Sequence, residues 1–135
     1  MRRYEEYVIK AKPKIDKFGP EIFFSGEEDY KTDVSMWFFL IKEPVLMEEK
    51  PHKHDFDIYL FFIGVENFFE LPGEVEIALG EEQELYVLTE PCTVYIPKGL
   101  LHCPLHFKRV DKPILFIHLT MAPKYEREEG LTSKD

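Results

Sequence analysis

Four of the five histidines in this chain fall into two short clusters. The first cluster contains His52 and His54, with Asp57 a few residues later. Residues two apart in an extended strand face the same side, so the two imidazoles would point in one direction. Two imidazoles with a carboxylate nearby are common ligands of borderline divalent metal ions. This segment therefore predicts part of a metal site.

The second cluster contains His102 and His106 and follows a turn marked by Pro97 and Gly99. Pro and Gly restrict the backbone of a tight turn, so His102 would leave the turn in a fixed direction. A His-x-His pair alone is a weak signal, and so is the turn alone. Their presence in one chain, with a carboxylate between them, strengthens the case for a metal site.

The elements that would position these clusters are short β-strands. In residues 74–80, apolar side chains alternate with polar or small ones, which is typical of a strand with one buried face. The segment around Gly80 predicts a hairpin, and a short helix is expected only at 124–129. The predicted strands are Met36–Ile41, Val45–Met47, Ile58–Ile63, Val75–Leu79, Leu85–Leu88, Thr93–Ile96 and Ile114–Thr120. Several short strands without a long helix favour an all-β sandwich or barrel.

The two clusters resemble the two motifs of the cupin family. The first motif is H-x-H followed by an acidic residue and a glycine, and it is matched by His52, His54, Asp57 and Gly64. The second motif is P-x-G-x-x-H, and it is matched by Pro97, Gly99 and His102. The resemblance covers roughly residues 36–120 and implies a cupin-type jelly-roll β-barrel, assigned to a domain at 36–135. Outside the resemblance, residues 1–35 are expected to form an irregular N-terminal arm, because Pro and Gly residues interrupt it. The resemblance also implies that one divalent ion is held by the metal ligands His52, His54, Asp57 and His102. Iron, manganese, nickel, zinc and copper all use such ligands, so the metal is not distinguished.

The chain departs from the family pattern at several positions. Asp57 stands where the family usually has Glu, and the shorter side chain puts its reach to the metal in doubt. Leu46 and Pro91 stand where glycines are common. His106 replaces an Asn and would add a titratable group near the metal. His106 and His118 are the candidate catalytic acid or base residues, with a buried structural histidine as the alternative for His118.

Two function classes remain open on these residues. The first is a small metal-dependent enzyme of oxygenase, isomerase or decarboxylase type, acting on a small organic molecule. The second is a non-catalytic module that binds or senses a small molecule, with or without metal. Cys92 and Cys103 are expected to pack in the interior, and Cys103 is expected to point away from the metal because it directly follows His102.

Composition limits the remaining possibilities. The 135 residues suit one domain, and 44% hydrophobic residues are enough for a packed core. A net charge of -9 disfavours nucleic acid and anionic membranes as partners. The first residues lack the apolar run of an export signal, and with two cysteines a cytoplasmic location is expected. The aromatic-rich arm and exposed sheet edges predict a homodimer.

Overall fold

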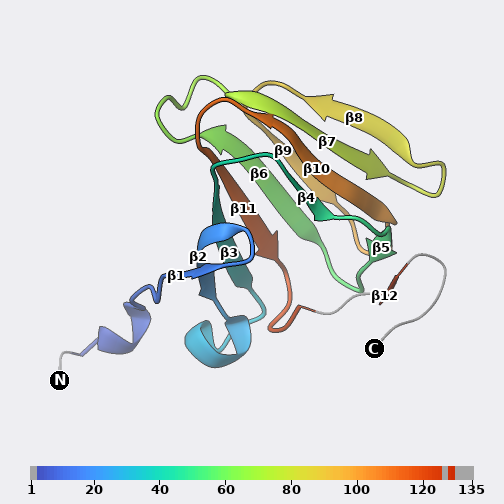
Figure 1. Cartoon of the computed structure of the whole chain (residues 1–135). Helices are drawn as coiled ribbons and strands as arrows, with labels where there is room; N and C mark the ends of the chain where they lie inside the picture. Colours follow the sequence, from blue (N-terminus) through green and yellow to red (C-terminus); the bar gives the residue numbers. More distant parts are fainter. Residues whose placement is uncertain (1–2, 126–127, 130–135) are drawn as a thin grey trace.

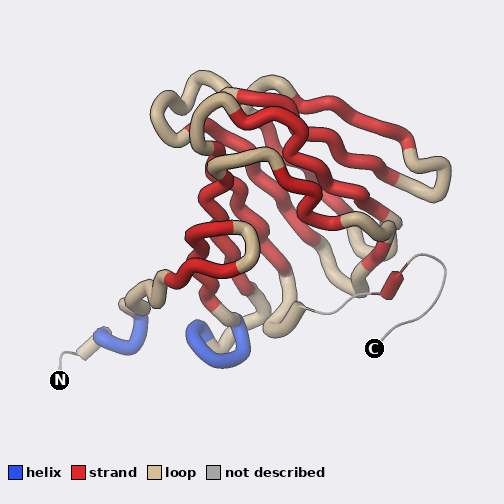
Figure 2. The backbone as a smooth tube through the Cα atoms, in the orientation of Figure 1, coloured by secondary structure: helices blue, strands red, loops and turns tan. Residues whose placement is uncertain are grey.

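Two antiparallel β-sheets face each other in the computed structural model, which describes residues 3–125 and 128–129. Figure 1 shows the sheets as two layers, with β8, β7 and β10 in one and β6, β11 and β3 in the other. Both layers are built of the strands drawn in red in Figure 2, and the two helical turns lie near the N-terminal end. The all-β prediction is therefore confirmed.

The first sheet has six strands and carries most of the buried aromatic residues. β11 lies at its centre, paired with β3 on one side and β6 on the other without a register shift. In spatial order the strands are β1 (Lys14–Asp16), β2 (Gly19–Phe24), β3 (Ser35–Ile41), β11 (Ile114–Thr120), β6 (Ile58–Gly64) and β9 (Cys92–Ile96).

The second sheet is organised around one long strand, β10. It pairs with β7 on one side and with β5 and β4 on the other. The strands are β12 (Glu128–Glu129), β5 (His52–Lys53), β10 (His102–Val110), β7 (Gly73–Leu79) and β8 (Glu84–Leu88), with β4 (Val45–Glu48) paired to β10. Six of the seven predicted strands match these elements to within one residue at each end, and Val75–Leu79 begins two residues after the start of β7. β10 was not predicted as a strand, because its sequence reads as the end of a turn.

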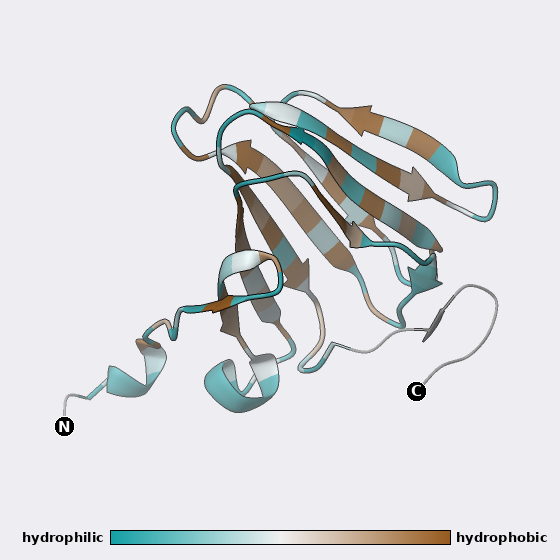
Figure 3. Ribbon diagram, in the orientation of Figure 1, coloured by the Kyte–Doolittle hydropathy of each residue, from teal (hydrophilic) through white to brown (hydrophobic). Residues whose placement is uncertain are grey.

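The core lies between the sheets and follows from period-two patterning. In β6 the alternate residues Ile58, Leu60 and Phe62 are buried, while the residues between them are only partly buried. Phe107 and Phe116 reach the same space from β10 and β11 and contact Phe62, with ring centroids 6.0 and 5.0 Å away. Brown and pale bands alternate along several strands in Figure 3, as expected for strands with one face in the core.

Two segments differ from simple expectation. Residues 14–24, inside the N-terminal arm, form β1 and β2, and β2 pairs with β3. The helix expected at 124–129 is wrong at the described positions, because Glu128–Glu129 form β12 against β5; residues 126–127 lie outside the described part. Within residues 3–125 and 128–129, the helical elements are a 3-10 turn at Glu5–Tyr7 and a π-helical turn at Gly26–Tyr30. Among described residues, no helix combines the length and apolar character required to cross a bilayer.

Candidate metal centre

His52 and His102 face each other across two paired strands. His52 on β5 is the register partner of His102 on β10, and their ring centroids are 4.4 Å apart. Both side chains are buried, with 2% and 3% of their surface exposed. Because their strands are paired, the backbones of the two residues are held opposite each other by the sheet.

Backbone carbonyls hold both rings in one orientation. Nδ1 of His52 lies 3.0 Å from the carbonyl oxygen of Lys50, and Nδ1 of His102 lies 2.9 Å from that of Leu100. A carbonyl can only accept, so Nδ1 carries the proton in each ring and Nε2 keeps its lone pair. Proteins use this arrangement to prepare imidazoles for a metal ion.

His54 completes a cluster of three buried imidazoles. Its ring centroid lies 5.0 Å from that of His52 and 5.1 Å from that of His102, and 4% of its surface is exposed. The backbone carbonyl of His54 accepts a hydrogen bond of 2.9 Å from the amide of Gly99. The two sequence clusters are therefore tied directly to each other.

The turn before His102 has the geometry that its sequence predicts. The amide of Leu100 donates to the carbonyl of Pro97 at 3.1 Å. Gly99 has a φ of +87°, a conformation that favours glycine, and its missing Cβ would meet no atom within 4 Å. The turn thus requires glycine for its backbone conformation and not for space.

Cys103 contradicts the expectation that it points away from the site. Nitrogen atoms of His52 and His102 and the Sγ of Cys103 all lie within 4.8 Å of one another. The reason is a break in the alternation of β10: the pairing with β7 shifts between His102 and Leu105, and Cys103 has a φ of +84°. This bulge presents two consecutive side chains to the interior.

Asp57 is not brought to the histidine cluster. Its carboxylate accepts a hydrogen bond of 2.8 Å from the amide of Lys98. It also lies close to Tyr95, whose pKa is raised by burial and then by the Asp57 charge. Tyr95 is half exposed on β9, on the outer side of the sheet. Asp57 therefore closes the turn at 97–99 from outside, and its carboxylate is not part of the group of close donor atoms formed by His52, His102 and Cys103.

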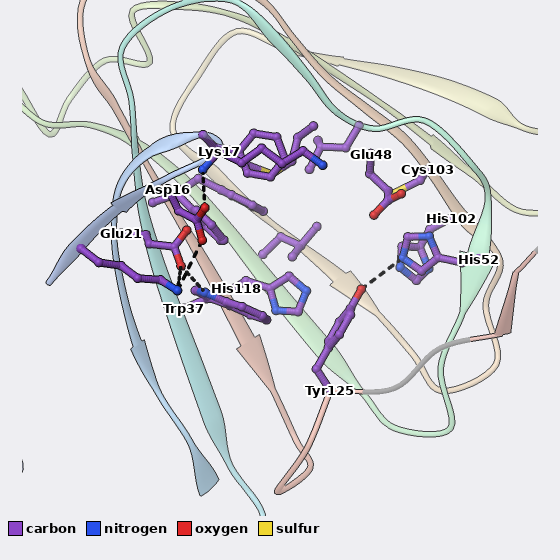
Figure 4. Close-up of a pocket in the computed structure, with 17 residues that line it drawn as sticks. Asp16, Lys17, Glu21, Trp37, Glu48, His52, His102, Cys103, His118 and Tyr125 are labelled. Carbon is purple, nitrogen blue, oxygen red and sulfur yellow. Dashed lines mark hydrogen bonds and ion pairs between the residues drawn. The ribbon is translucent and has the colours of Figure 1, made fainter. Parts of the chain in front are cut away.

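Two residues at the cluster were missed by sequence reasoning. The Tyr125 hydroxyl lies 3.4 Å from Nε2 of His52, and the Tyr125 ring centroid lies 4.8 Å from that of His54. Glu48, at the end of β4, lines the same cavity as Cys103 and His102 and is labelled with them in Figure 4. Glu48 could have been found only by pairing β4 with the unpredicted β10. Tyr125 lies in the segment read as a helix.

A cavity of about 470 Å³ adjoins the cluster. One end of the cavity, shown in Figure 4, is lined by His52, His102, Cys103, Glu48 and Tyr125. The middle is apolar and aromatic, with Trp37, Phe39, Leu60, Leu105 and Phe116. Pockets of this size bury organic ligands of moderate size.

Charged side chains from β1, β2 and the turn between them form the other end of the cavity. Lys14 makes ion pairs with Asp16 and Glu21 at 3.3 and 3.9 Å. Glu21 is buried and also accepts from Nε1 of Trp37 at 3.4 Å. Lys17 lies over the Phe18 ring, 5.3 Å from its centroid. The N-terminal segment thus supplies a polar wall of the cavity.

The two candidate catalytic histidines have different positions. His106 lies between the buried residues Leu105 and Phe107 on β10, so it faces the opposite side, and it does not line the cavity. The structure therefore does not bring His106 to the histidine cluster. His118 does line the cavity, and its Nδ1 lies 3.1 Å from Oγ1 of Thr120. Burial and then the nearby His54 lower the pKa of His118 to about 3, so it is neutral at neutral pH.

Comparisons with known proteins give a structural match only. No family model and no curated protein matches the sequence. A substituted variant of oxalate decarboxylase from Bacillus subtilis matches with a TM-score of 0.57 and 12% identity, over 86% of this chain and 28% of that one. A structure from work on the Mn(II) centres of the B. subtilis enzyme gives the same values. A third oxalate decarboxylase structure matches with a TM-score of 0.59 and 10% identity, over 87% and 30%.

The fold is a cupin-type jelly roll. The chain spans less than a third of the length of the oxalate decarboxylases that it matches. At this identity the likeness establishes the arrangement of strands, and the chemistry must be argued from the site.

The donor atoms of the cluster fit a transition-metal ion. Imidazole nitrogen suits zinc, copper, iron and nickel, and a thiol adds a soft donor. The histidine rings are already held by backbone carbonyls, and their burial excludes water from the side away from the cavity. Open positions on an ion held here would face the cavity, because His52 and His102 line its wall.

Proposed function

We propose that this chain is a metal-dependent cupin enzyme whose ion is held by His52, His54 and His102 and faces a cavity for a small organic molecule. The observation that supports it is the convergence of three buried imidazoles, two of which, those of His52 and His102, line one end of a cavity. Isolated buried histidines need only one hydrogen-bond partner each. Three histidine side chains that converge, two of them oriented by backbone carbonyls, are better suited to binding a cation than to packing in an apolar core.

The chemistry follows from the two ends of the cavity. A bound divalent ion would supply Lewis acidity toward a substrate oxygen, or activation of dioxygen or water. The apolar middle would hold the body of an organic substrate against Trp37 and Phe116. The neutral His118 would offer a hydrogen bond to the substrate and no charge, since its low pKa makes it a weak base. Oxygenase, isomerase and decarboxylase reactions all remain within this proposal.

The size of the cavity argues against a very small substrate. About 470 Å³ with an aromatic wall would leave much apolar surface uncovered around a two-carbon acid. We therefore expect a substrate with a ring or aliphatic body and at least one oxygen donor. A second polar group of the substrate would contact the charged side chains at the end of the cavity away from the histidines, which are Lys14, Asp16, Lys17 and Glu21.

Metal content of matched variants tests the proposal. Protein purified without chelator and loaded with zinc or iron should hold about one equivalent per chain, and His102→Ala should lower the affinity at least ~10-fold. His106→Ala is the matched control, because His106 is on the same strand and faces away. The proposal would be contradicted if both variants kept the metal, or if both lost it to the same extent.

Turnover then separates an enzyme from a binding module. Oxygen uptake and product analysis with catechols, keto acids and sulfur amino acids would be measured on the loaded protein. Turnover that is lost in His102→Ala and kept in His106→Ala supports catalysis at this site. Saturable ligand binding without turnover of any ligand that binds would favour the sensing module.

A further inference from the structure

The bulge in β10 places a second kind of donor atom beside the histidines. Cys103 is buried, with 4% of its surface exposed, and lines the cavity next to His102 and His52. Its backbone is held from the β7–β8 hairpin, where Nε2 of Gln83 donates to the carbonyl of Cys103 at 3.0 Å. The amide of Gly80 in the same hairpin donates to Leu101 at 2.7 Å. The position of Cys103 is therefore fixed by hydrogen bonds.

The distances allow one ion to touch both histidines and the cysteine. Donor atoms around a tetrahedral zinc ion lie roughly 3.5 Å apart, given Zn–N near ~2.0 Å and Zn–S near ~2.3 Å. The Sγ of Cys103 and the nitrogens of His52 and His102 lie within 4.8 Å of one another. Shifts of about 1 Å or less, within the reach of side-chain rotation, would bring them to bonding distance.

We propose that the Sγ of Cys103 is a ligand of this ion, which makes the centre a histidine–thiolate site in place of the expected histidine–carboxylate site. This inference rests on the proposed metal site and adds its donor set. As the metal–sulfur bond forms, the thiol proton leaves to solvent, and Cys103 binds as thiolate.

The carboxylates nearby do not take this place. Asp57 faces outward and accepts from Lys98. In the part of the chain that the structure describes, the group of mutually close donor atoms contains His52, His102 and Cys103. No carboxylate belongs to this group, and His54 joins the cluster through its ring, 5.0 and 5.1 Å from the rings of His52 and His102. Glu48 lines the same end of the cavity, where it could instead accept a hydrogen bond from a molecule bound to the ion.

A thiolate changes which metals the site prefers. Thiolate favours zinc, copper and iron, whereas manganese and magnesium prefer oxygen donors. The structurally similar B. subtilis oxalate decarboxylase contains Mn(II) centres. This chain would then share the fold and differ in metal, because one bulged residue supplies sulfur.

Cobalt(II) substitution tests the donor set without relying on activity. Chelator-stripped, reduced protein is titrated with Co(II), and its absorption is recorded for the wild type, Cys103→Ser and Cys92→Ser. Cobalt bound to thiolate gives an intense near-ultraviolet charge-transfer band, while any bound cobalt gives weak visible bands. Cys92 is the matched control, because it is half-buried on β9 and burial raises the pKa of its thiol.

The expected result is a near-ultraviolet band in the wild type and Cys92→Ser that is absent in Cys103→Ser. The chain has two cysteines, so the band in Cys92→Ser can come only from Cys103 even if Cys103→Ser does not fold. Visible bands without the near-ultraviolet band would overturn the thiolate ligand and leave the metal site standing. No cobalt spectrum at all would overturn both.

Metal competition gives a second measurement. Replacing a thiolate ligand should weaken zinc binding in Cys103→Ser at least ~10-fold, as changes at metal ligands commonly do. Manganese binding should change much less, because manganese gains little from sulfur. Equal weakening for both ions would contradict a sulfur ligand.

Discussion

The hydroxyl of Tyr125 lies 3.4 Å from Nε2 of His52, the ring atom that a metal would use. Since Nδ1 of His52 faces the Lys50 carbonyl, Nε2 is the acceptor and Tyr125 the donor. Tyrosine and metal therefore compete for one lone pair. Binding of the ion must move the hydroxyl away from it.

Removing this competitor should tighten metal binding. A long hydrogen bond contributes about 0.5 kcal/mol, so Tyr125→Phe should lower the zinc Kd by about two- to threefold. Isothermal titration calorimetry against the wild type measures it. Weaker binding in the variant would mean that the hydroxyl helps to hold the ion or a molecule on it.

Asp57 should affect stability and not the metal. Asp57→Ala removes the acceptor of the Lys98 amide, so we expect a loss of about 0.5–1 kcal/mol in the free energy of unfolding, because the bond is exposed to solvent. The zinc Kd should stay within about twofold, since ligand loss costs ~10-fold or more. Urea unfolding and calorimetry measure the two quantities. Much weaker zinc binding in Asp57→Ala would show that Asp57 is a metal ligand.

The buried, neutral His118 should make the metal-free protein sensitive to acid. Its pKa is about 3 in the folded state, against 6.5 for a histidine in water, so the unfolded state binds more protons between these pH values. This stability is fully present above about pH 6.5 and is lost as the pH falls toward 3. At about pH 5 the loss should be roughly 2 kcal/mol.

His118→Gln isolates this contribution. Gln does not titrate, so its free energy of unfolding should fall less between neutral pH and about pH 5, by roughly 2 kcal/mol, than that of the wild type. Urea unfolding at both pH values gives the comparison. Parallel losses in the two proteins would show that other groups carry the pH dependence.

We propose that the chain forms a homodimer along β8. This strand is an edge of the second sheet, and Leu85, Tyr86 and Val87 on it are 56%, 43% and 50% exposed. An exposed apolar edge strand pairs readily with another strand. Light scattering should give twice the chain mass of 16.1 kDa.

A charge on this edge should separate the copies. Val87→Lys is expected to shift the scattering mass to that of one chain, because lysine on an edge opposes strand pairing. Phe69→Lys is the control, since Phe69 is 93% exposed outside any strand. A monomeric wild type would rule out the dimer, and a dimer retained in Val87→Lys would move the interface elsewhere.

Much of the scaffold follows from local patterning. The strands around β6 and β11 were predictable because apolar and β-branched residues dominate them and turn residues bound them. His52, His54 and His102 were predictable because two-residue spacing and a Pro-Gly turn fix directions locally. These features need only the residues within a few positions of each side chain.

What sequence reasoning missed depends on non-local pairing. The direction of Cys103 is reversed by a bulge that arises where β10 pairs with β7. Pro104 was a local signal for it, because a proline inside a paired strand is typical of a bulge. Asp57 was assigned by its column in a family motif, while the amide of Lys98, 41 positions away, decides where it points. His106 was placed near the metal for the same reason, although its strand parity relative to Phe107 turns it outward.

β5 is only two residues long, yet it joins β10 to β12 within the second sheet. So short a strand has little backbone pairing of its own to keep it in place. An ion shared by His52 and His102 would cross-link β5 to β10. By mass action it would stabilise the folded chain by about 2.7 kcal/mol when the free metal concentration is 100 times the Kd. Cellular metal supply would then govern how long the chain resists proteolysis, in addition to whether its centre is loaded.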